Sequence, residues 1–250
     1  MKTIQAITFD FWGTLYYSIH PNNTGRVSAL QKALQAAGQP ALPAEILEQA
    51  IQTSWQEWVR VWEEEHRTWG AVDWLAHLKQ LLGFQLPGHI ETDLIQELEE
   101  VLLDGNTQPI QGVLQIIPAL AGQYRLGLIS DTGISSGKTL SKLLARDGLL
   151  PHFSCLIYSD EVHKSKPDPI PFQAALQGLG KEAHQTVHVG DLRRTDITGA
   201  RNAGLWSIRF SGHQDDAHIE YGDGDVVLVD YEQMPAALQT IEELAQRLMR

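Results

Sequence analysis

The hydrophobic positions of this chain follow two different periods. From residue 113 onward, short apolar runs that suit buried strands alternate with segments whose apolar residues recur every three or four positions. The strands predicted there are 124–129, 155–158, 186–189, 207–210 and 226–229, and the helices are 113–121, 135–145, 171–178, 197–203 and 231–249. Another strand is predicted near the amino terminus, where an apolar run ends at Asp10. This alternation indicates an α/β fold whose parallel sheet is covered on both faces.

After Leu15 the helical period continues for about ninety residues. It predicts four helices: 23–38, one from Pro43 to Trp62, 72–82 and 90–103. We therefore expect residues 1–15 and 106–250 to form the sheet domain and 16–105 an inserted all-helical unit. Five of the seven tryptophans lie in this unit at helical spacing, and we expect most of them to form its core. The same pattern suits a subunit contact, so the oligomeric state stays open.

The composition fits a globular protein with a sizeable core, because 43% of the 250 residues are hydrophobic and 20% are charged. No apolar run approaches the roughly 20 residues that span a bilayer. The first six residues lead directly into the first strand, so no signal peptide is expected. The single cysteine, Cys155, cannot form an internal disulfide, and these features together favour a cytoplasmic protein.

The net charge of −12 argues against a nucleic-acid partner or a membrane surface. Binding to phosphate backbones needs clustered lysine and arginine, and the sequence contains no such cluster. The acidic residues are typical of solvated helix faces.

The first strand delivers Asp10 to the carboxyl end of the sheet, where open α/β folds bind ligands. Gly13 follows at once and permits a sharp turn, because it has no Cβ. A carboxylate held there can act as a nucleophile toward phosphorus or carbon, although an ordinary capping aspartate fits this motif equally well.

Two later strand ends carry groups that suit an anionic substrate. Ser130 and Asp131 follow the strand 124–129, and a hydroxyl group beside backbone N–H groups can hold phosphate oxygens. Lys166 precedes Pro167, which keeps it extended and out of a helix. A lysine so placed can pair with both an attacking carboxylate and a phosphate, although a solvent-exposed lysine in a turn fits that segment alone.

A fourth strand end carries two acids. Asp191 follows the strand 186–189 and a glycine, and Asp196 stands five positions later, where a helix is predicted to begin. Paired carboxylates at a sheet edge suit Mg²⁺, a hard cation that takes a few carboxylates and keeps several waters. Asp196 also suits a helix N-cap.

A nucleophile, a serine, a lysine and an acid pair thus occur in that order, each at a predicted strand end. In this respect the chain resembles the haloacid dehalogenase-like hydrolase superfamily over essentially its whole length. The resemblance implies a Rossmann-like, doubly wound core, a mobile helical cap inserted after the first motif, and a small-molecule substrate.

The resemblance also implies roles for the residues that handle the substrate. Asp10 would attack it and become a covalent aspartyl intermediate. Ser130 would bind the transferring group, with Asp131 and Thr14 as further substrate- or phosphate-binding residues. Lys166 would neutralise charge at the nucleophile.

A metal site follows from the same resemblance. Asp10, Asp191 and the backbone carbonyl of Trp12 would hold Mg²⁺, and Asp196 would support the ion directly or through water. Metal and lysine charge would offset the repulsion between a carboxylate and an anionic phosphate.

The chain departs from the phosphatase pattern at Trp12, where phosphatases of the superfamily usually carry a second, acid–base aspartate. We expect a Mg²⁺-dependent phosphatase that is slow unless its leaving group is good, since such acid–base groups contribute about 10²- to 10⁴-fold. Asp131 and His163 are candidate replacements for the missing acid, and a structural role is the simpler interpretation of each.

Three alternatives stay open. A dehalogenase attacks carbon without a metal and needs no acid at this position, which suits Trp12 but not the acid pair. A catalytically impaired binding protein would have Trp12 filling its pocket. A phosphonate-cleaving relative would need a lysine from the helical unit, and Lys32 and Lys79 are better explained as surface residues.

Overall fold

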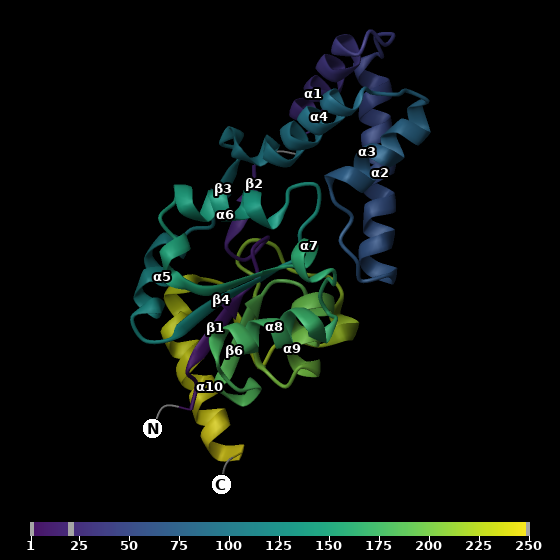
Figure 1. Ribbon diagram of the computed structural model, residues 1–250. Coiled ribbons are helices and arrows are strands. Elements are labelled where there is room, and N and C mark those ends of the chain that lie inside the picture. The colour runs from purple at the N-terminus through teal and green to yellow at the C-terminus, as the bar shows by residue number, and fades with distance from the viewer. Residues whose placement is uncertain (1–2, 20–22, 249–250) are drawn as a thin grey trace.

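A six-stranded parallel sheet forms the centre of the computed structural model, which describes residues 3–19 and 23–248. The strand order is β5-β4-β1-β6-β7-β8, with β1 between β4 and β6 (Figure 1). The chain winds outward from β1 in one direction through β4 and β5 and in the other through β6, β7 and β8. Ligands bind beyond the carboxyl ends of strands at such a reversal. The strands are β1 Ala6–Phe9, β4 Arg125–Ser130, β5 Phe153–Tyr158, β6 Thr186–Gly190, β7 Trp206–Phe210 and β8 Val226–Leu228.

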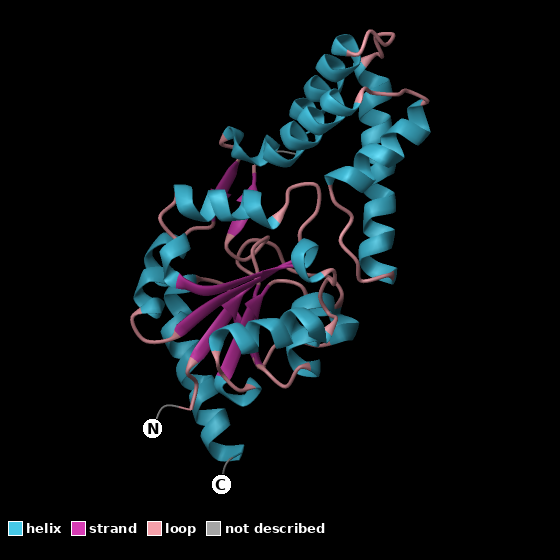
Figure 2. Ribbon diagram, in the orientation of Figure 1, coloured by secondary structure: helices cyan, strands magenta, loops and turns pink. Residues whose placement is uncertain are grey.

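Helices cover both faces of the sheet, as Figure 2 shows. Residues of α5, α6 and α10 share one apolar core with Ile7 and Phe9 of β1. On the other face, α8 and α9 pack around Ile129 and Phe172. Strand side chains alternate between the two faces, so each strand has to be apolar on both sides. These helices are α5 Val113–Ala121, α6 Gly137–Arg146, α8 Pro169–Leu179, α9 Thr198–Asn202 and α10 Met234–Leu248.

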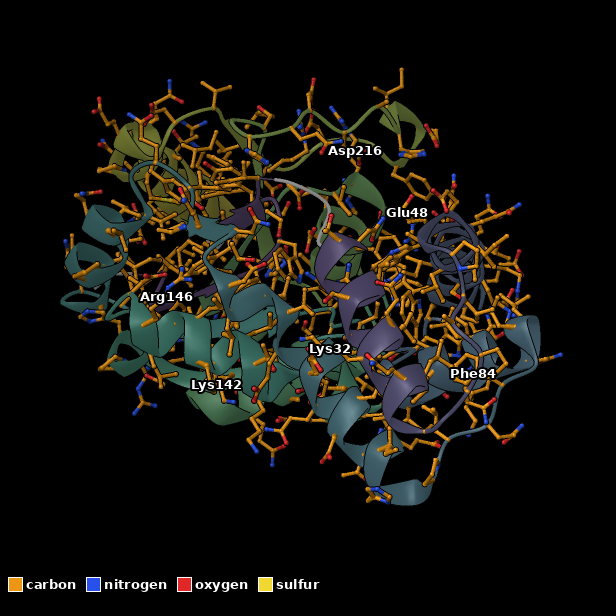
Figure 3. The ribbon with its side chains drawn as sticks, turned by 90° about the horizontal axis from the view of Figure 1, so that it is seen from above. Lys32, Glu48, Phe84, Lys142, Arg146 and Asp216 are labelled. Atoms are coloured by element: carbon orange, nitrogen blue, oxygen red, sulfur yellow. The ribbon has the colours of Figure 1, made fainter. Side chains whose placement is uncertain are left out.

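Four helices form a second body beside the carboxyl edge of the sheet (Figures 1 and 2). They surround a core of their own, in which Trp74 is fully buried. Salt bridges join α4 to its neighbours: Lys32 of α1 pairs with Glu97, and Lys142 of α6 pairs with Glu100. Figure 3 labels the two lysines. The helices are α1 Asn23–Ala36, α2 Ala44–Glu64, α3 Ala71–Leu82 and α4 Gly88–Glu100, followed by a 3₁₀ turn Val101–Asp104.

A short ribbon connects the two bodies, and the sequence pattern did not predict it. Strand β2, Tyr16–Ser18, pairs antiparallel with β3, Thr107–Pro109. The helical unit was predicted to begin at residue 16, but Tyr16–Ser18 form a strand and the first helix begins at Asn23. Each strand has only three residues, too few to show an alternating pattern. The ring of Tyr16 stacks on Phe11 and its hydroxyl donates to Asp147, which fixes the ribbon against the sheet domain.

The remaining predicted elements agree with the structure within a few residues. The carboxyl-terminal helix differs most, because a 3₁₀ turn Tyr231–Gln233 precedes α10. Its predicted end at Met249 lies outside the described residues. A one-turn helix α7, Ser159–Val162, follows β5 without having been predicted. Among the residues described, none of the helices has the length and apolar character needed to cross a bilayer.

We expect Trp74→Ala to lower the free energy of unfolding by about 3–5 kcal/mol, because it leaves a large cavity in the core of the four helices. Val72→Ala on the same helix is the matched control, since Val72 is 63% exposed and should change stability by less than about 0.5 kcal/mol. Urea unfolding followed by circular dichroism measures both. Equal effects of the two substitutions would contradict the packing described here.

Candidate active site and metal centre

Three carboxylates meet at the carboxyl edge of the sheet. Asp10 follows β1, Asp191 follows β6, and Asp196 lies in the turn after β6. Each offers an oxygen, and these three oxygens lie within 4.8 Å of one another. All three residues are buried. Buried carboxylates repel one another unless cations compensate their charge.

Lys166 supplies one such cation. Its side chain is buried, and Nζ lies 2.5 Å from Oδ1 of Asp10 and 2.6 Å from Oδ1 of Asp196. Burial alone would lower the pKa of Lys166, but the charges of Asp10, Asp196 and Asp131 outweigh it and raise the pKa. The ammonium group therefore stays protonated. It forms the two ion pairs that hold Asp10 and Asp196 together.

Asp196 is fully engaged by its neighbours. Besides Lys166, Oδ1 receives a hydrogen bond from Nε2 of His188 at 3.1 Å, and Oδ2 accepts from the backbone N–H of Leu192 at 3.0 Å. Burial raises the pKa of Asp196, but Lys166 and His188 more than offset this, so the net shift is downward. Asp196 was expected to stand at the beginning of a helix, and this expectation was wrong. It lies inside a π-helical turn, Arg193–Ile197, that precedes α9.

Asp191 differs from Asp196 in lacking such partners. Its Oδ1 is buried and has no hydrogen-bond partner among the described residues. Burial, followed by the charges of Asp10 and Asp196, raises its pKa. Burial also raises the pKa of Asp10 to about 7, despite the attraction of Lys166.

The charge of this centre is unbalanced, since three carboxylates face one ammonium. An unpartnered carboxylate oxygen beside two more carboxylates fits a hard divalent cation such as Mg²⁺. The turn after β1 is shaped to the same centre. Gly13 has φ +71°, and a Cβ there would overlap the carboxylate of Asp191.

The predicted phosphate-binding residues lie close to this centre in the fold. Ser130 is buried at the end of β4, the strand next to β1, and its hydroxyl donates to the carbonyl of Asp131 at 3.2 Å. Thr14 is buried in the turn after β1, and its hydroxyl has no partner among the residues described. Two hydroxyl groups thus flank Asp10, on the adjacent strand and in the following turn.

The carboxylate of Asp131 is held by two donors. Oδ1 accepts from the backbone N–H of Lys166 at 2.9 Å, and Oδ2 accepts from the indole N–H of Trp62 at 2.9 Å. Asp131 thereby fixes the segment that carries Lys166 and also contacts α2. No local pattern indicates this role of Trp62, because its partner Asp131 is distant in the chain.

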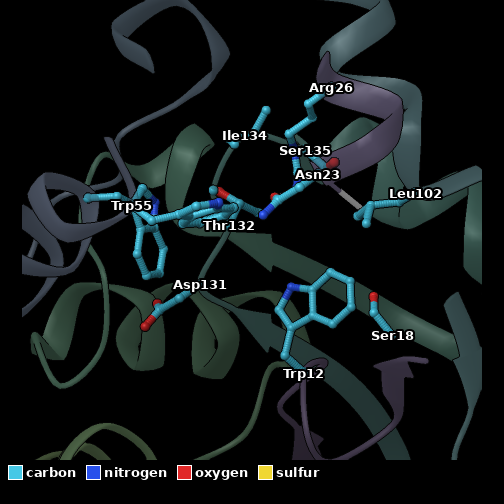
Figure 4. A pocket seen from close by; sticks show the side chains of 12 residues that line it. Trp12, Ser18, Asn23, Arg26, Trp55, Leu102, Asp131, Thr132, Ile134 and Ser135 are labelled. Atoms are coloured by element: carbon cyan, nitrogen blue, oxygen red, sulfur yellow. The ribbon is translucent and has the colours of Figure 1, made fainter. Parts of the chain in front are cut away.

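A cavity of about 510 Å³ opens beside this centre, between the four helices and the turns after β1 and β4 (Figure 4). Trp12 and Asp131 lie on its sheet side. Trp55 and Trp58 of α2 form part of its wall. The volume suits a small molecule.

The tryptophans of the helical body contribute both to its core and to the cavity. Trp74 and Trp69 are buried in its core. Trp55 and Trp58 pack against that core but also line the cavity, and Trp62 contacts Asp131. Four of the five are thus in the core or packed against it, as expected for most of them, and Trp55 and Trp58 line the cavity as well. Helical spacing places them on one side of α2 but does not say what that side faces.

Other sequence candidates lie elsewhere. His163 lines a separate cavity with Thr68 and Asp160. Lys32 is exposed and pairs with Glu97, so its surface placement is confirmed. Lys79 pairs with Glu91 at 2.7 Å and is not among the residues that line the tryptophan-walled cavity.

Besides Trp62, the sequence pattern did not indicate His188, which also supports the centre. His188, in the middle of β6, bonds Asp196 through Nε2 and lies 2.9 Å through Nδ1 from the hydroxyl of Thr8. Burial lowers its pKa. The only available signal was a polar residue between the two valines of an otherwise apolar strand.

These features define a class: a Rossmann-like α/β protein with carboxylates and a lysine clustered at the carboxyl edge of its sheet. The family model described as haloacid dehalogenase-like hydrolase matches residues 4–204, and the chain belongs to this family. The resemblance predicted from the four strand ends and the α/β fold are both confirmed.

Several characterised proteins are similar to this chain. Pyrimidine 5′-nucleotidase YjjG of Escherichia coli (strain K12) is 30% identical over 139 residues, which cover 55% of this chain and 56% of that protein. Glyceraldehyde 3-phosphate phosphatase of Methanopyrus kandleri is 25% identical over 244 residues, 97% of this chain and 99% of that protein. The structure of a 2-haloacid dehalogenase from Pseudomonas syringae pv. Tomato DC3000 aligns with a TM-score of 0.68 and 25% identity, over 94% of this chain and 98% of that one.

The unequal pairing of the two acids predicts opposite effects on stability. With EDTA present at pH 7, Asp191→Asn should raise the melting temperature, because it removes a buried negative charge beside the carboxylates of Asp10 and Asp196. Asp196→Asn should lower the free energy of unfolding by about 3–5 kcal/mol, because it breaks a buried ion pair. Thermal and urea unfolding measure these changes. A loss of stability in Asp191→Asn equal to that in Asp196→Asn would show that the described charge balance is wrong.

Proposed function

We propose that this protein is a Mg²⁺-dependent phosphatase that acts on a small phosphorylated metabolite through an aspartyl-phosphate on Asp10. One observation carries the proposal: Asp191, whose Oδ1 is buried and unpartnered, brings a carboxylate oxygen within 4.8 Å of oxygens of Asp10 and Asp196, beside the ammonium of Lys166. Relatives named as phosphatases support the reaction class, among them the Methanopyrus kandleri enzyme and phosphoglycolate phosphatase of Neisseria meningitidis, which is 25% identical over 238 residues.

In this proposal Asp10, Asp191 and the backbone carbonyl of Trp12 hold the ion. Bound Mg²⁺ would supply positive charge to the phosphate oxygens and orient them. Asp196 is already paired with Lys166 and His188, so we assign it a supporting role, in which it keeps Lys166 directed at Asp10.

The reacting groups are few. A carboxylate oxygen of Asp10 attacks phosphorus, and the bond from phosphorus to the leaving oxygen breaks. Water then attacks the aspartyl-phosphate, which releases phosphate and restores Asp10. Lys166 offsets the negative charge that gathers at the attacking oxygen. The hydroxyls of Ser130 and Thr14 donate to phosphate oxygens.

Asp131 and Trp12 line the cavity into which the leaving group would extend, so both are candidates for protonating the leaving oxygen. Asp131 lines the cavity beside Trp12, and both of its carboxylate oxygens accept hydrogen bonds. These bonds direct its oxygens toward Lys166 and Trp62, so we assign Asp131 to positioning and not to protonation of the leaving oxygen. Trp12 cannot transfer a proton either, so the leaving oxygen takes its proton from water and turnover depends strongly on leaving-group quality.

The two alternatives are less well supported. Similarity to a named dehalogenase and the aromatic Trp12 favour attack on carbon. However, an uncompensated carboxylate cluster would repel the carboxylate of a haloacid substrate. For a binding protein with a filled pocket, the 510 Å³ cavity beside Trp12 is the opposing observation.

With para-nitrophenyl phosphate, whose leaving group needs little protonation, we expect hydrolysis that requires Mg²⁺ and stops with EDTA. Asp10→Asn should reduce kcat to background, because an amide is a poor nucleophile. Absorbance at neutral pH follows product release. Activity that survives EDTA, or halide release from a chlorinated carboxylic acid, would instead support the dehalogenase alternative.

Trp12→Asp should raise kcat for alkyl phosphates by about tenfold or more if the missing acid limits the rate. Trp12→Asn is the matched control, because it opens the same space without supplying a proton. Phosphate release from glycerol phosphate provides the measurement. Equal rates in the two variants would reject proton transfer as the limiting factor.

A further inference from the structure

The cavity beside Trp12 is polarised from one side to the other. Asp131 and Trp12 lie on the sheet side, and Arg26 of α1 lies on the opposite side (Figure 4). The wall between them is largely apolar and includes Trp55 and Trp58 of α2, Leu102 of the turn after α4, and Ile134. A substrate whose phosphate is at Asp10 would extend its leaving group into this cavity.

Arg26 is a buried cation without a direct ion pair: burial lowers the pKa of its guanidinium to about 10, and Asp104 offsets only part of this from beyond ion-pair distance. It is only 6% exposed, and among residues 3–19 and 23–248 it makes no ion pair with a carboxylate. Its Nη1 donates a long hydrogen bond, 3.4 Å, to Oδ1 of Asn23, and its guanidinium carbon lies 5.3 Å from the ring centre of Trp55. Its Nε is buried and unpartnered. Burying an unpaired charge is costly, so a buried arginine without an ion pair suits an anionic group of a bound ligand.

Two further buried donors in the same lining have no partner in the described part of the chain. They are the indole N–H of Trp58 and the hydroxyl of Ser135. Buried polar groups are nearly always hydrogen-bonded. These three donor atoms are covered by their neighbours, so a ligand that carries acceptor oxygens would satisfy them after rotation of side chains that already line the cavity. Trp12, Trp55 and Trp58 provide flat faces against which a ring can pack.

We propose that the leaving group of the natural substrate is an aromatic ring that carries one carboxylate, which is bound by Arg26. The charge selects a monoanion: a single buried guanidinium balances one carboxylate, whereas a second phosphate would bring an excess charge among indole rings. The carboxylate accepts from Arg26 and the other orphan donors, and the ring lies between the tryptophans. This inference rests on the proposed phosphatase function for the orientation of the substrate. It does not rest on that function for binding of the released hydroxyaryl acid.

Binding is therefore tested without turnover. The probes are para-hydroxybenzoate, para-hydroxyphenylacetate and para-hydroxyphenylpropanoate, each paired with its uncharged amide, and quenching of tryptophan fluorescence reports occupancy of a cavity lined by indoles. At least one acid should bind about ten- to hundredfold more tightly than its amide, the range of a charge-assisted hydrogen bond. Equal affinity within every pair overturns the inference.

Substitutions of Arg26 test whether this residue causes the preference for the acid over its amide. Arg26→Gln should bring the ratio of acid to amide affinity close to one, and Arg26→Lys, which keeps the charge, should restore part of it. Lys32→Gln on the same helix is the matched control, because the Lys32 side chain is 67% exposed and pairs only outside the cavity. The ratio should stay at the wild-type value in that variant. A ratio that survives Arg26→Gln in a protein with an unchanged circular dichroism spectrum would place the carboxylate elsewhere and overturn the inference.

Kinetics separate this inference from the proposed function. With Mg²⁺, the phosphate ester of the preferred acid should have a lower KM than the ester of its amide, by the same factor as the binding ratio. If the acid binds through Arg26 but neither ester is hydrolysed, the inference stands and the phosphatase function fails. If both esters are hydrolysed at equal KM, the phosphatase function stands and the inference fails.

Discussion

The buried ammonium group of Lys166 is the interaction on which the rest of the centre depends. It joins Asp10, delivered by β1, to Asp196, delivered by the turn after β6, although these segments are far apart in the chain. Its own position is set by Asp131 at the end of β4. Three adjacent strand ends are thus connected through one side chain. The parallel sheet makes this possible, because parallel strands bring all their carboxyl ends to the same edge.

Most of the sheet and most of the predicted centre were available from the sequence for one reason. Asp10, Ser130 and Asp191 each follow a short, mainly apolar run, which marks a buried strand, and the end of a strand fixes where its next residue lies. His188 escaped notice because its role depends on which face of β6 it occupies, and Arg26 and Trp62 because their partners belong to other elements. The three-residue strands β2 and β3 are stabilised by pairing with each other, which no local pattern records.

The helical body contributes to the centre mainly through α2. Trp55 and Trp58 line the cavity, while one turn further along Trp62 donates to Asp131 and packs against the guanidinium of Arg194, 4.2 Å from its ring centre. One helix thus supplies both a wall for the ligand and a contact to the residue that holds Lys166. Changes in the amphipathic stripe of α2 would alter the cavity and the centre together.

The two-stranded ribbon has a mechanical consequence. The chain leaves the sheet domain through β2 and returns through β3, and these strands are hydrogen-bonded to each other, so both crossings form one connection. A rotation of the helical body would have to bend this connection about a single axis. Away from the ribbon, the carbonyl of His66 accepts from the backbone N–H of Ser165, and Trp62 donates to Asp131. Individual hydrogen bonds of this kind contribute only about 1 kcal/mol each. Admission of a ligand to the cavity would therefore break a few such bonds and would also withdraw Ile134, in the loop after β4, from the core of the four helices.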